Sequence, residues 1–388
     1  MANRNRVIYQ SEGLFVSENA SSHLAADVEQ LGRVQSANYS FTINRQDVNQ
    51  YGDLARIDSL VLDPPTVSLD FSYYLTDGFN ERALGFYVAN TGSGQGVQRE
   101  VYSSGVGTGN FASGHLTANS GVNMYIVTSP DGEDLNKAGD GEAIDASDTV
   151  IGIGNCYISD YSLDLSVGSL PTVNVTMEGA NMRSSSNGSS IGNPAIDQEA
   201  GTALATTISL PNPTQDGGIT GDTGGAPLTA LRPGDVTVNL ADVNADSMAV
   251  IDGNNGAHIQ SVSLSMPLSR SPIQRLGSKF PFARSVDFPV DISMSVSAIM
   301  NDTRAANLVS ILDAGVDTIS FAVADPNDST NTAIRGDLKG VKLDSESFSS
   351  SVGSNKTVDL TFSTQVGGPN DTDNGFFMSG IGFNHVFI

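Results

Sequence analysis

Alternation of apolar and polar side chains at every second position dominates the chain and predicts β-strands with one buried face. In the first clear example, Tyr39, Phe41 and Ile43 fall on one face, while serine, threonine and asparagine fill the other. The same alternation occurs at 67–73, 161–167, 173–177, 264–268, 290–296 and 358–362. Sheets with one buried and one solvated face are usually antiparallel. The pattern therefore predicts a mainly β protein.

The chain contains a diverged copy of part of itself. Residues 34–52 align without gaps on 259–277, with identities at Gln35, Ser36, Ser40, Arg45 and Gly52. Residues 157–177 align on 342–362 and share a Val-Gly-Ser turn followed by Thr-Val, and 67–74 resembles 290–297. Three blocks that recur in the same order favour duplication of a whole domain over chance similarity.

Each copy is expected to carry one helix after its second strand. In the second copy, Asn301 or Asp302 begins the predicted helix, an apolar stripe follows, and Gly315 ends it. In the first copy, Asp77 precedes the sequence FNERALGFYVA, in which Gly85 lowers helix propensity. Each copy ends in a hairpin, with glycine-containing turns at 168–171 and 353–356.

We therefore predict two tandem β-sandwich or barrel domains, each with one flanking α-helix. The boundaries follow the repeat and the composition: an N-terminal segment at 1–33, a first β domain at 34–182, a second at 259–368 and a C-terminal arm at 369–388. The first domain includes a Gly-rich insertion at about 89–156. Residues 183–258 form an acidic Gly/Pro-rich linker or a small inserted subdomain. The acidity of both segments predicts solvent-facing loops.

Composition narrows the class of function. With 388 residues and 39% hydrophobic content, the chain is long enough for two cores. A net charge of -24 disfavours nucleic-acid binding, because an acidic surface repels phosphates. The single cysteine, Cys156, fits assembly in a reducing cytoplasm. We expect no signal peptide and no membrane span, since neither a signal-type apolar core nor a long apolar run is present.

No catalytic constellation emerges from the sequence. The acidic segment 131–142 has the length of a calcium loop but places Asn136 where that loop requires glycine. The four histidines are scattered, the glycine-rich stretches lack the lysine of a phosphate loop, and Cys156 lies at the edge of a strand pattern. We therefore predict no enzyme activity, no metal and no cofactor.

Three stretches of sequence resemble the major tail proteins, or tail tube proteins, of long-tailed bacteriophages. They are RVIYQSEGLFVS at 6–17, RVQSANYSFTINRQDVNQYG at 33–52 and PPTVSLDFSYYLTDGFNERALGF at 64–86. The second copy shares this resemblance through the internal repeat. The resemblance implies tail-tube-like domains, each a β-sandwich flanked by a helix, whose inner strands join neighbouring subunits in a barrel around a lumen.

The resemblance also implies an assembly. Six such units close a ring and rings stack into a tube, so a chain with two units would close as a trimer with pseudo-sixfold symmetry. The long connections at 44–65 and 269–289 would correspond to the loop that docks onto the adjacent ring. The candidate ring-stacking residues are Arg45, Asp47, Arg56, Asp58, Arg270 and Arg284. The expected partners are further copies of the chain, tail-terminator, baseplate or tape-measure proteins, and DNA in transient passage. The expected location is the virion tail, after assembly in the host cytoplasm.

Physical arguments favour the same assembly. An unpaired edge strand promotes aggregation, and barrel closure between subunits removes it. An acidic lumen would repel DNA and let it slide. We therefore expect some of these acids to face the lumen: Asp70, Asp160, Asp164, Asp291 and Asp359.

Two other functions are considered. A β-sandwich module of a baseplate, or a receptor-binding module that recognises carbohydrate, could display the Gly/Ser/Asn-rich segments, although tryptophan is absent. A hydrolase would need a nucleophile or a carboxylate pair that the sequence does not single out.

Overall fold

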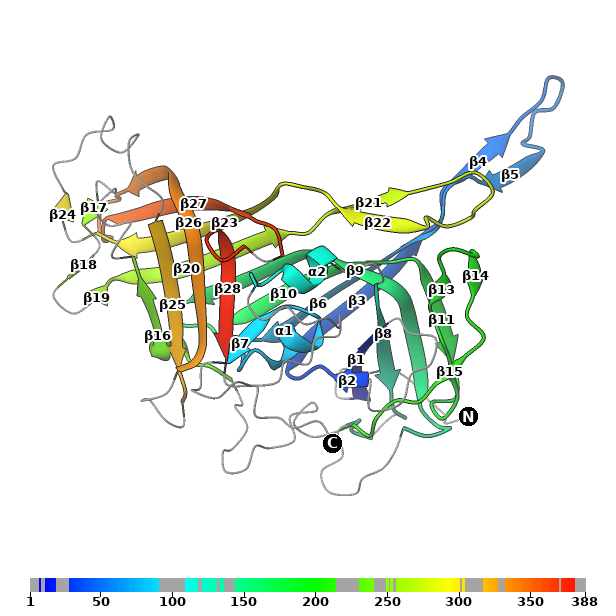
Figure 1. Ribbon diagram of the computed structural model, residues 1–388, viewed down its shortest axis with the longest axis horizontal. Coiled ribbons are helices and arrows are strands. Elements are labelled where there is room, and N and C mark those ends of the chain that lie inside the picture. The colour runs from blue at the N-terminus through cyan, green and yellow to red at the C-terminus, as the bar shows by residue number, and fades with distance from the viewer. Residues whose placement is uncertain are drawn as a thin grey trace.

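The computed structural model of the chain is mainly β (Figure 1). It describes residues 7, 11–18, 28–90, 109–117, 121–130, 133–135, 144–213, 230–240, 249–250, 252–253, 256–300, 302–303, 317–326, 332–369 and 371–380. The helices within these ranges are short: α1 (Phe79–Ala83), α2 (Ser113–Thr117) and the 3-10 helix η3 (Pro233–Asp235). Among the described residues, no helix has the length and apolar character needed to cross a bilayer.

Eight long strands form one sheet, here called the central sheet. Its order is β3–β6–β10–β9–β20–β23–β27–β26, and every neighbouring pair in it is antiparallel. The first four, here the first set, are β3 (Val34–Thr42), β6 (Thr66–Tyr74), β10 (Thr172–Gly179) and β9 (Thr149–Ser166). The last four, here the second set, are β20 (Ile259–Pro267), β23 (Val290–Ile299), β27 (Thr357–Val366) and β26 (Thr332–Ser349).

The two sets share one pairing register. Ala37 lies opposite Phe71, and Val262 lies opposite Val296, each 225 positions later. Val173 lies opposite Leu163, and Val358 opposite Phe348, each 185 positions later. The β-bulges also recur at matching places. The bulge between Val34 and Ser36 matches the one between Ile259 and Ser261, and the bulge between Ile158 and Asp160 matches the one between Leu343 and Ser345.

This register corrects one of the three sequence alignments. The strand at 67–74 matches 292–299, two residues later than the predicted 290–297, because its partners fix the pairing. The error kept every side chain on its own face, since side chains alternate with a period of two. The other two alignments, and the turns at 168–171 and 353–356, are confirmed. Gly168 and Gly353 have φ angles of 88° and 92°, a left-handed conformation that glycine adopts without a Cβ clash.

The longest strands bend out of the central sheet into two flanking sheets. The first half of β9 pairs with β8 (Val122–Thr128) and β11 (Asn181–Ser185), and the first half of β26 pairs with β25 (Asp317–Ala324) and β28 (Gly375–Gly380). The bends contain left-handed residues at matching positions, Asn155 with φ 53° and Gly340 with φ 67°. The outer strands are β1 (Glu12–Glu18), β2 (Val28–Gln30), β7 (Val88–Asn90) and β16 (Val236–Asn239).

Two-stranded ribbons complete the described structure. They are β4 (Arg45–Val48) with β5 (Asp58–Val61), β21 (Arg270–Ile273) with β22 (Ala283–Val286), β12 (Ile191–Gly192) with β15 (Thr207–Ile208), β13 (Ile196–Asp197) with β14 (Thr202–Ala203), β17 (Ala249–Val250) with β24 (Asp302–Thr303), and β18 (Asp252–Gly253) with β19 (Gly256–Ala257).

The segments predicted to be solvent-facing loops contribute to the core instead. Within the Gly-rich segment 89–156, Tyr125 and Ile153 are fully buried. Within 183–258, Ile196 and Ile208 are buried, and Ile196 exchanges hydrogen bonds with the Asn155 side chain. Acid counts misled the prediction because the described acids of these segments lie outside the long strands, whereas β8 and the first half of β9 are mostly apolar. The acidic segment 131–142 lies outside the described residues except at 133–135.

The first predicted helix is present but short. Asp77 Oδ1 accepts a hydrogen bond from the Phe79 backbone amide at 3.1 Å, and Gly85, with φ 96°, follows the helix. The second predicted helix, at 301–315, lies outside the described residues apart from Asp302 and Thr303, which form β24 instead of a helix start.

Helix α1 brings an acid into the core. Glu81 is 1% exposed and accepts hydrogen bonds from the hydroxyls of Tyr73, at 2.8 Å, and Tyr161, at 3.4 Å. Burial raises the pKa of Glu81 from 4.5 to about 7, because the ionised carboxylate loses its hydration. The folded state therefore favours the protonated acid.

Glu81 is expected to make stability fall as pH rises. A group whose pKa is raised on folding contributes its full stability below the unfolded pKa, and loses it as pH passes through the folded value. We expect a loss of about 3 kcal/mol in the free energy of unfolding between pH 4.5 and pH 7. Urea denaturation of Glu81→Gln, across pH 4 to 8, should show a shallower decline than the unmodified chain. Equal pH slopes in both proteins would contradict this.

Candidate assembly surfaces

One face of the central sheet is polar throughout, and it carries all five acids predicted for a lumen. Thr176 lies opposite both Asp70 on β6 and Asp160 on β9, so the three side chains share a face. The same cross-strand pairing places Asp164 opposite Ser263, Asp291 opposite Gln365 and Asp359 opposite Ser297. The other face buries Leu69, Leu163, Met294 and Phe362 in the core.

The polar face is rich in hydroxyls and carries more acids than bases. Its acids receive hydrogen bonds from neighbouring strands: Thr176 donates to Asp70 at 2.8 Å, and Gln365 donates to Asp291 at 3.0 Å. Partial burial raises the pKa of Asp160. Glu178 adds a sixth carboxylate, and among the described positions of this face the one base is Lys342, opposite Ser363. A surface with this balance repels phosphate groups.

The strands at the two ends of the central sheet each have one edge without a partner strand, whereas the two sets are joined at the middle by a paired and buried seam. At the middle, β9 pairs with β20, and Leu163 lies opposite Leu264, at 1% and 2% exposure. The matching residues at the two ends are Phe348 on β26 and Tyr39 on β3, at 43% and 42%. Within the described chain, β3 pairs only with β6, and residues 342–349 of β26 pair only with β27. Each end is therefore an unpaired strand edge with a large apolar side chain.

The predicted ring-stacking residues lie on two long hairpins. The β4–β5 hairpin projects beyond the body of the chain, while β21–β22 extends from the second set across the first (Figure 1). In the β4–β5 hairpin, Arg56 pairs with Asp47 at 2.9 Å, and Asp58 Oδ1 accepts from the Ser59 amide at 2.7 Å. Arg45 begins β4.

The β21–β22 hairpin is bound to the first set within the same chain. The Arg270 guanidinium lies 4.7 Å from the centre of the Tyr157 ring and donates to the backbone oxygen of His115. Arg284, with a side chain only 8% exposed, pairs with Glu178 at 3.4 Å. Arg270 and Arg284 therefore hold this hairpin against the first set of their own chain.

Both hairpin tips expose large apolar side chains. Tyr51 in the first hairpin and Leu276, at the matching position of the second, are fully exposed. Leu54 is fully exposed as well. Large apolar side chains exposed to this degree make each tip a candidate interaction surface. The sequence prediction singled out the charged residues of these hairpins and missed the apolar tips, although the fully apolar Tyr51/Leu276 match was visible in the alignment.

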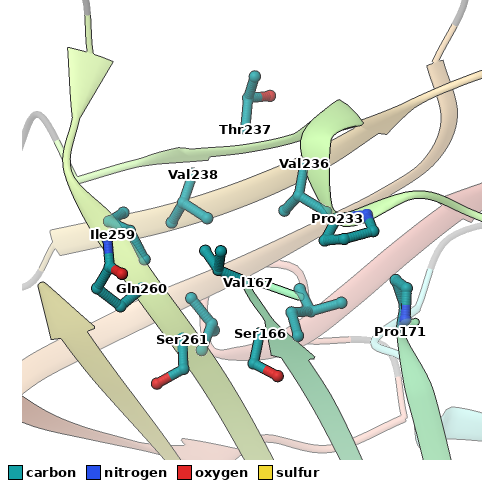
Figure 2. A pocket seen from close by; sticks show the side chains of 12 residues that line it. Ser166, Val167, Pro171, Pro233, Val236, Thr237, Val238, Ile259, Gln260 and Ser261 are labelled. Carbon is teal, nitrogen blue, oxygen red and sulfur yellow. The ribbon is translucent and has the colours of Figure 1, made fainter. Parts of the chain in front are cut away.

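A cleft of about 260 Å³ lies where the first set meets the second (Figure 2). It is lined by Leu165, Val167, Pro233, Val236, Ile259 and neighbouring residues, without a histidine, cysteine or carboxylate among them. Elsewhere, burial lowers the pKa of His115 to about 3 and raises that of Cys156 to about 12, so neither is poised for chemistry near neutral pH. The part of the chain that the structure describes holds no cluster of metal-ligating side chains.

Comparisons with known proteins add little to this geometry. No family model matches the chain, and no curated protein matches its sequence. Among solved structures, it is similar to a chain of the sixfold-symmetrised cryo-EM structure of the anti-feeding prophage baseplate, at 12% identity and a TM-score of 0.23. The match covers 32% of this chain and 80% of that one. A likeness at this level carries no argument about function.

Proposed function

We propose that the chain is a structural protein that builds a phage-like tail tube, with two tandem copies of one tube domain per chain. The observation that carries this proposal is the internal seam between β9 and β20. There β9, the last strand of the first set, pairs with β20, the first strand of the second set, and each of the two has a partner strand on both edges. The same two strand types, β26 and β3, remain open at the ends of the sheet.

Copies of the chain would therefore join by pairing β26 of one copy with β3 of the next, in the way that β9 pairs with β20 inside the chain. The register of the seam sets the register between copies, with Tyr39 opposite Phe348, Ser40 opposite Ser347 and Asn38 opposite Ser349. Such a contact is head-to-tail, and head-to-tail contacts close into a ring when the rotation per copy allows it. Closure would remove both open edges and bury the exposed aromatic side chains.

Three copies give a ring of suitable size. Each chain supplies eight strands to the central sheet, so a trimer would form a 24-stranded barrel. At ~4.8 Å between strands and a tilt of about 40°, the backbone diameter would be roughly 45–50 Å, which leaves a lumen wider than a DNA duplex. The polar face, with Asp70, Asp160, Asp164, Asp291 and Asp359, would line that lumen and repel the phosphates of passing DNA.

The hairpin tips are the proposed stacking contacts. Tyr51, Leu54 and Leu276 would bury apolar surface against the next ring, with the ion pair of Asp47 and Arg56 on the same hairpin as Tyr51 and Leu54. The proposed partners follow: further rings of the same chain, and the tail-terminator, baseplate and tape-measure proteins of the same particle. The proposed location is the tail of a virion.

The alternative of a carbohydrate-binding baseplate or receptor module has no specific observation in its favour. The exposed aromatic side chains of the central sheet lie along its open edges, not in a recessed platform. The described surface offers no catalytic cluster to a hydrolase hypothesis.

Electron microscopy of the purified chain across a concentration series tests the proposal. We expect rings with threefold or pseudo-sixfold end views at low concentration and hollow stacks at high concentration. A cryo-EM map of those rings should place the five acids on the inner surface. Monomers or compact trimers that never stack would overturn the proposal, and a map with all five acids outside would overturn the lumen assignment.

A further inference from the structure

We infer that the β4–β5 hairpin binds laterally, in a groove on the second set of the neighbouring copy in the same ring. This inference rests on the proposed ring. It assigns an occupant to a groove that is open in the isolated chain, and it separates the arm of this hairpin from its tip, which stays available for stacking.

The second hairpin provides the precedent. Where β20 continues into β21–β22, the Leu268 amide donates to the Ser159 backbone oxygen at 2.8 Å. Arg270 then packs on Tyr157 of β9, and Arg284 pairs with Glu178 of β10. Tyr157, Ser159 and Glu178 form the part of the first set that this hairpin contacts. By the shared register, the matching residues on the second set are Lys342, Asp344 and Ser363.

Those matching positions line an open groove. Its volume is about 470 Å³, and its lining includes Asp291, Lys342, Asp344 and Ser363. On the first set, the equivalent place is occupied by the two arginines of β21–β22. On the second set, no described segment of the chain enters it, and the β4–β5 hairpin is the matching element that lacks a binding place.

The residues of hairpin and groove differ together between the two sets. Arg284 on the second hairpin pairs with Glu178 on the first set. The position that matches Arg284 on the first hairpin is Ser59, and the position that matches Glu178 in the groove is Ser363, so both charges are absent there. A lone arginine or a lone glutamate at either position would have left a charge without its partner. Paired replacement by serine fits two surfaces that meet.

Charge favours the same fit. Arg45 matches Arg270, so in the groove it would lie next to Lys342, which takes the place of Tyr157, with the carboxylates of Asp291 and Asp344 lining the same groove. The groove alone carries two carboxylates and one ammonium, so the incoming guanidinium completes the balance. Its flat, delocalised cation suits carboxylate recognition.

Thiol-specific cross-linking tests this contact. The double variant Ser59→Cys, Ser363→Cys is treated with a short bismaleimide, and ring formation is measured separately by electron microscopy of the same sample. Side chains at the matching pair, Arg284 and Glu178, meet at 3.4 Å, so the two thiols lie within the reach of such a linker. Each single variant, and Ser59→Cys with Ser169→Cys in a distant turn, serve as controls.

We expect rings together with covalent dimers and trimers of chains, formed by the double variant alone. Rings without inter-chain cross-links would overturn the lateral contact and leave the proposed ring intact. Absence of both rings and cross-links would overturn the ring itself.

As a second measurement, Arg45→Glu should raise the protein concentration needed for ring assembly about tenfold. Arg45→Glu with Asp344→Arg should bring that concentration back most of the way to the value of the unmodified chain. Arg232→Glu, the same charge change on the exposed arginine that precedes η3, should leave it unchanged.

Discussion

Replacement of Tyr39 with lysine is expected to abolish ring assembly and to leave the monomer folded. Tyr39 lies on the open edge strand β3 and is 42% exposed, so the isolated chain tolerates a charged side chain there. In the ring it would face Phe348 of the next copy, as Leu264 faces Leu163 inside the chain. Loss of one buried large apolar side chain costs roughly 2 kcal/mol per contact, and an unpaired buried ammonium adds to that cost.

The expected change is at least ~30-fold in the association constant of each contact, equivalent to ~2 kcal/mol. Sedimentation velocity across a concentration series measures it, and circular dichroism checks the fold. Ser40→Lys is the matched control, since Ser40 is adjacent on the same strand but belongs to the polar face. Rings of Tyr39→Lys at unchanged concentration would refute the edge contact, as would equal loss in both variants.

Serine at both hairpin tips, Tyr51→Ser with Leu276→Ser, is expected to yield rings that do not stack. Both side chains are fully exposed in the chain, so their removal costs the monomer little. In a tube each would bury apolar surface, worth roughly 1–3 kcal/mol per side chain. Because a trimeric ring presents six such tips, the losses accumulate at every ring-to-ring contact.

Electron microscopy gives the readout as tube length against protein concentration. Ring diameter should stay unchanged, and the concentration at which tubes appear should rise more than tenfold. Leu170→Ser, a similar replacement in the turn at 168–171, is the control and should stack normally. Tubes of normal length from the double variant would show that stacking depends on other surfaces.

The sequence predicted the central sheet well because its signal is local. The alternation at 39–43, 67–73 and 290–296 depends only on which face of a strand is buried, and the structure places β3, β6 and β23 there, with β3 ending at Thr42. The repeat predicted the matching hairpins as well, since Arg45 and Arg270 begin β4 and β21. The placement of the five acids on one polar face follows from the same periodicity.

The flanking sheets escaped prediction because their formation depends on distant partners. The first half of β9 is a strand with both edges paired, and β8 is buried on every residue, so neither shows clean alternation. Composition suggested a loop there. The lateral groove could not be predicted for the same reason. It lies where β26 bends at Gly340, and only the strand pairing shows that it corresponds to the site where Arg270 binds on the first set.

The contrast between sealed and open edges is also invisible in the sequence. Leu264 and Tyr39 occupy matching positions in similar patterns, yet one is buried and the other exposed. The difference arises from which strand lies alongside, a property of the fold and of the assembly. That contrast is the basis of the proposed ring.

A disulfide between copies tests this account most directly. Residues directly opposite on antiparallel strands have Cα atoms about 4.5–5.5 Å apart, within the range that a disulfide spans. Ser40 and Ser347 lie at opposite ends of an eight-stranded sheet, roughly 30 Å apart, so a bond between them within one chain is excluded. Under mild oxidation, Ser40→Cys with Ser347→Cys, which keeps the apolar contact of Tyr39 with Phe348, should form reducible dimers and closed trimers, while Ser40→Cys with Phe348→Cys, which point to opposite faces, should not. A double variant that assembles normally but never forms the in-register bond would contradict the account.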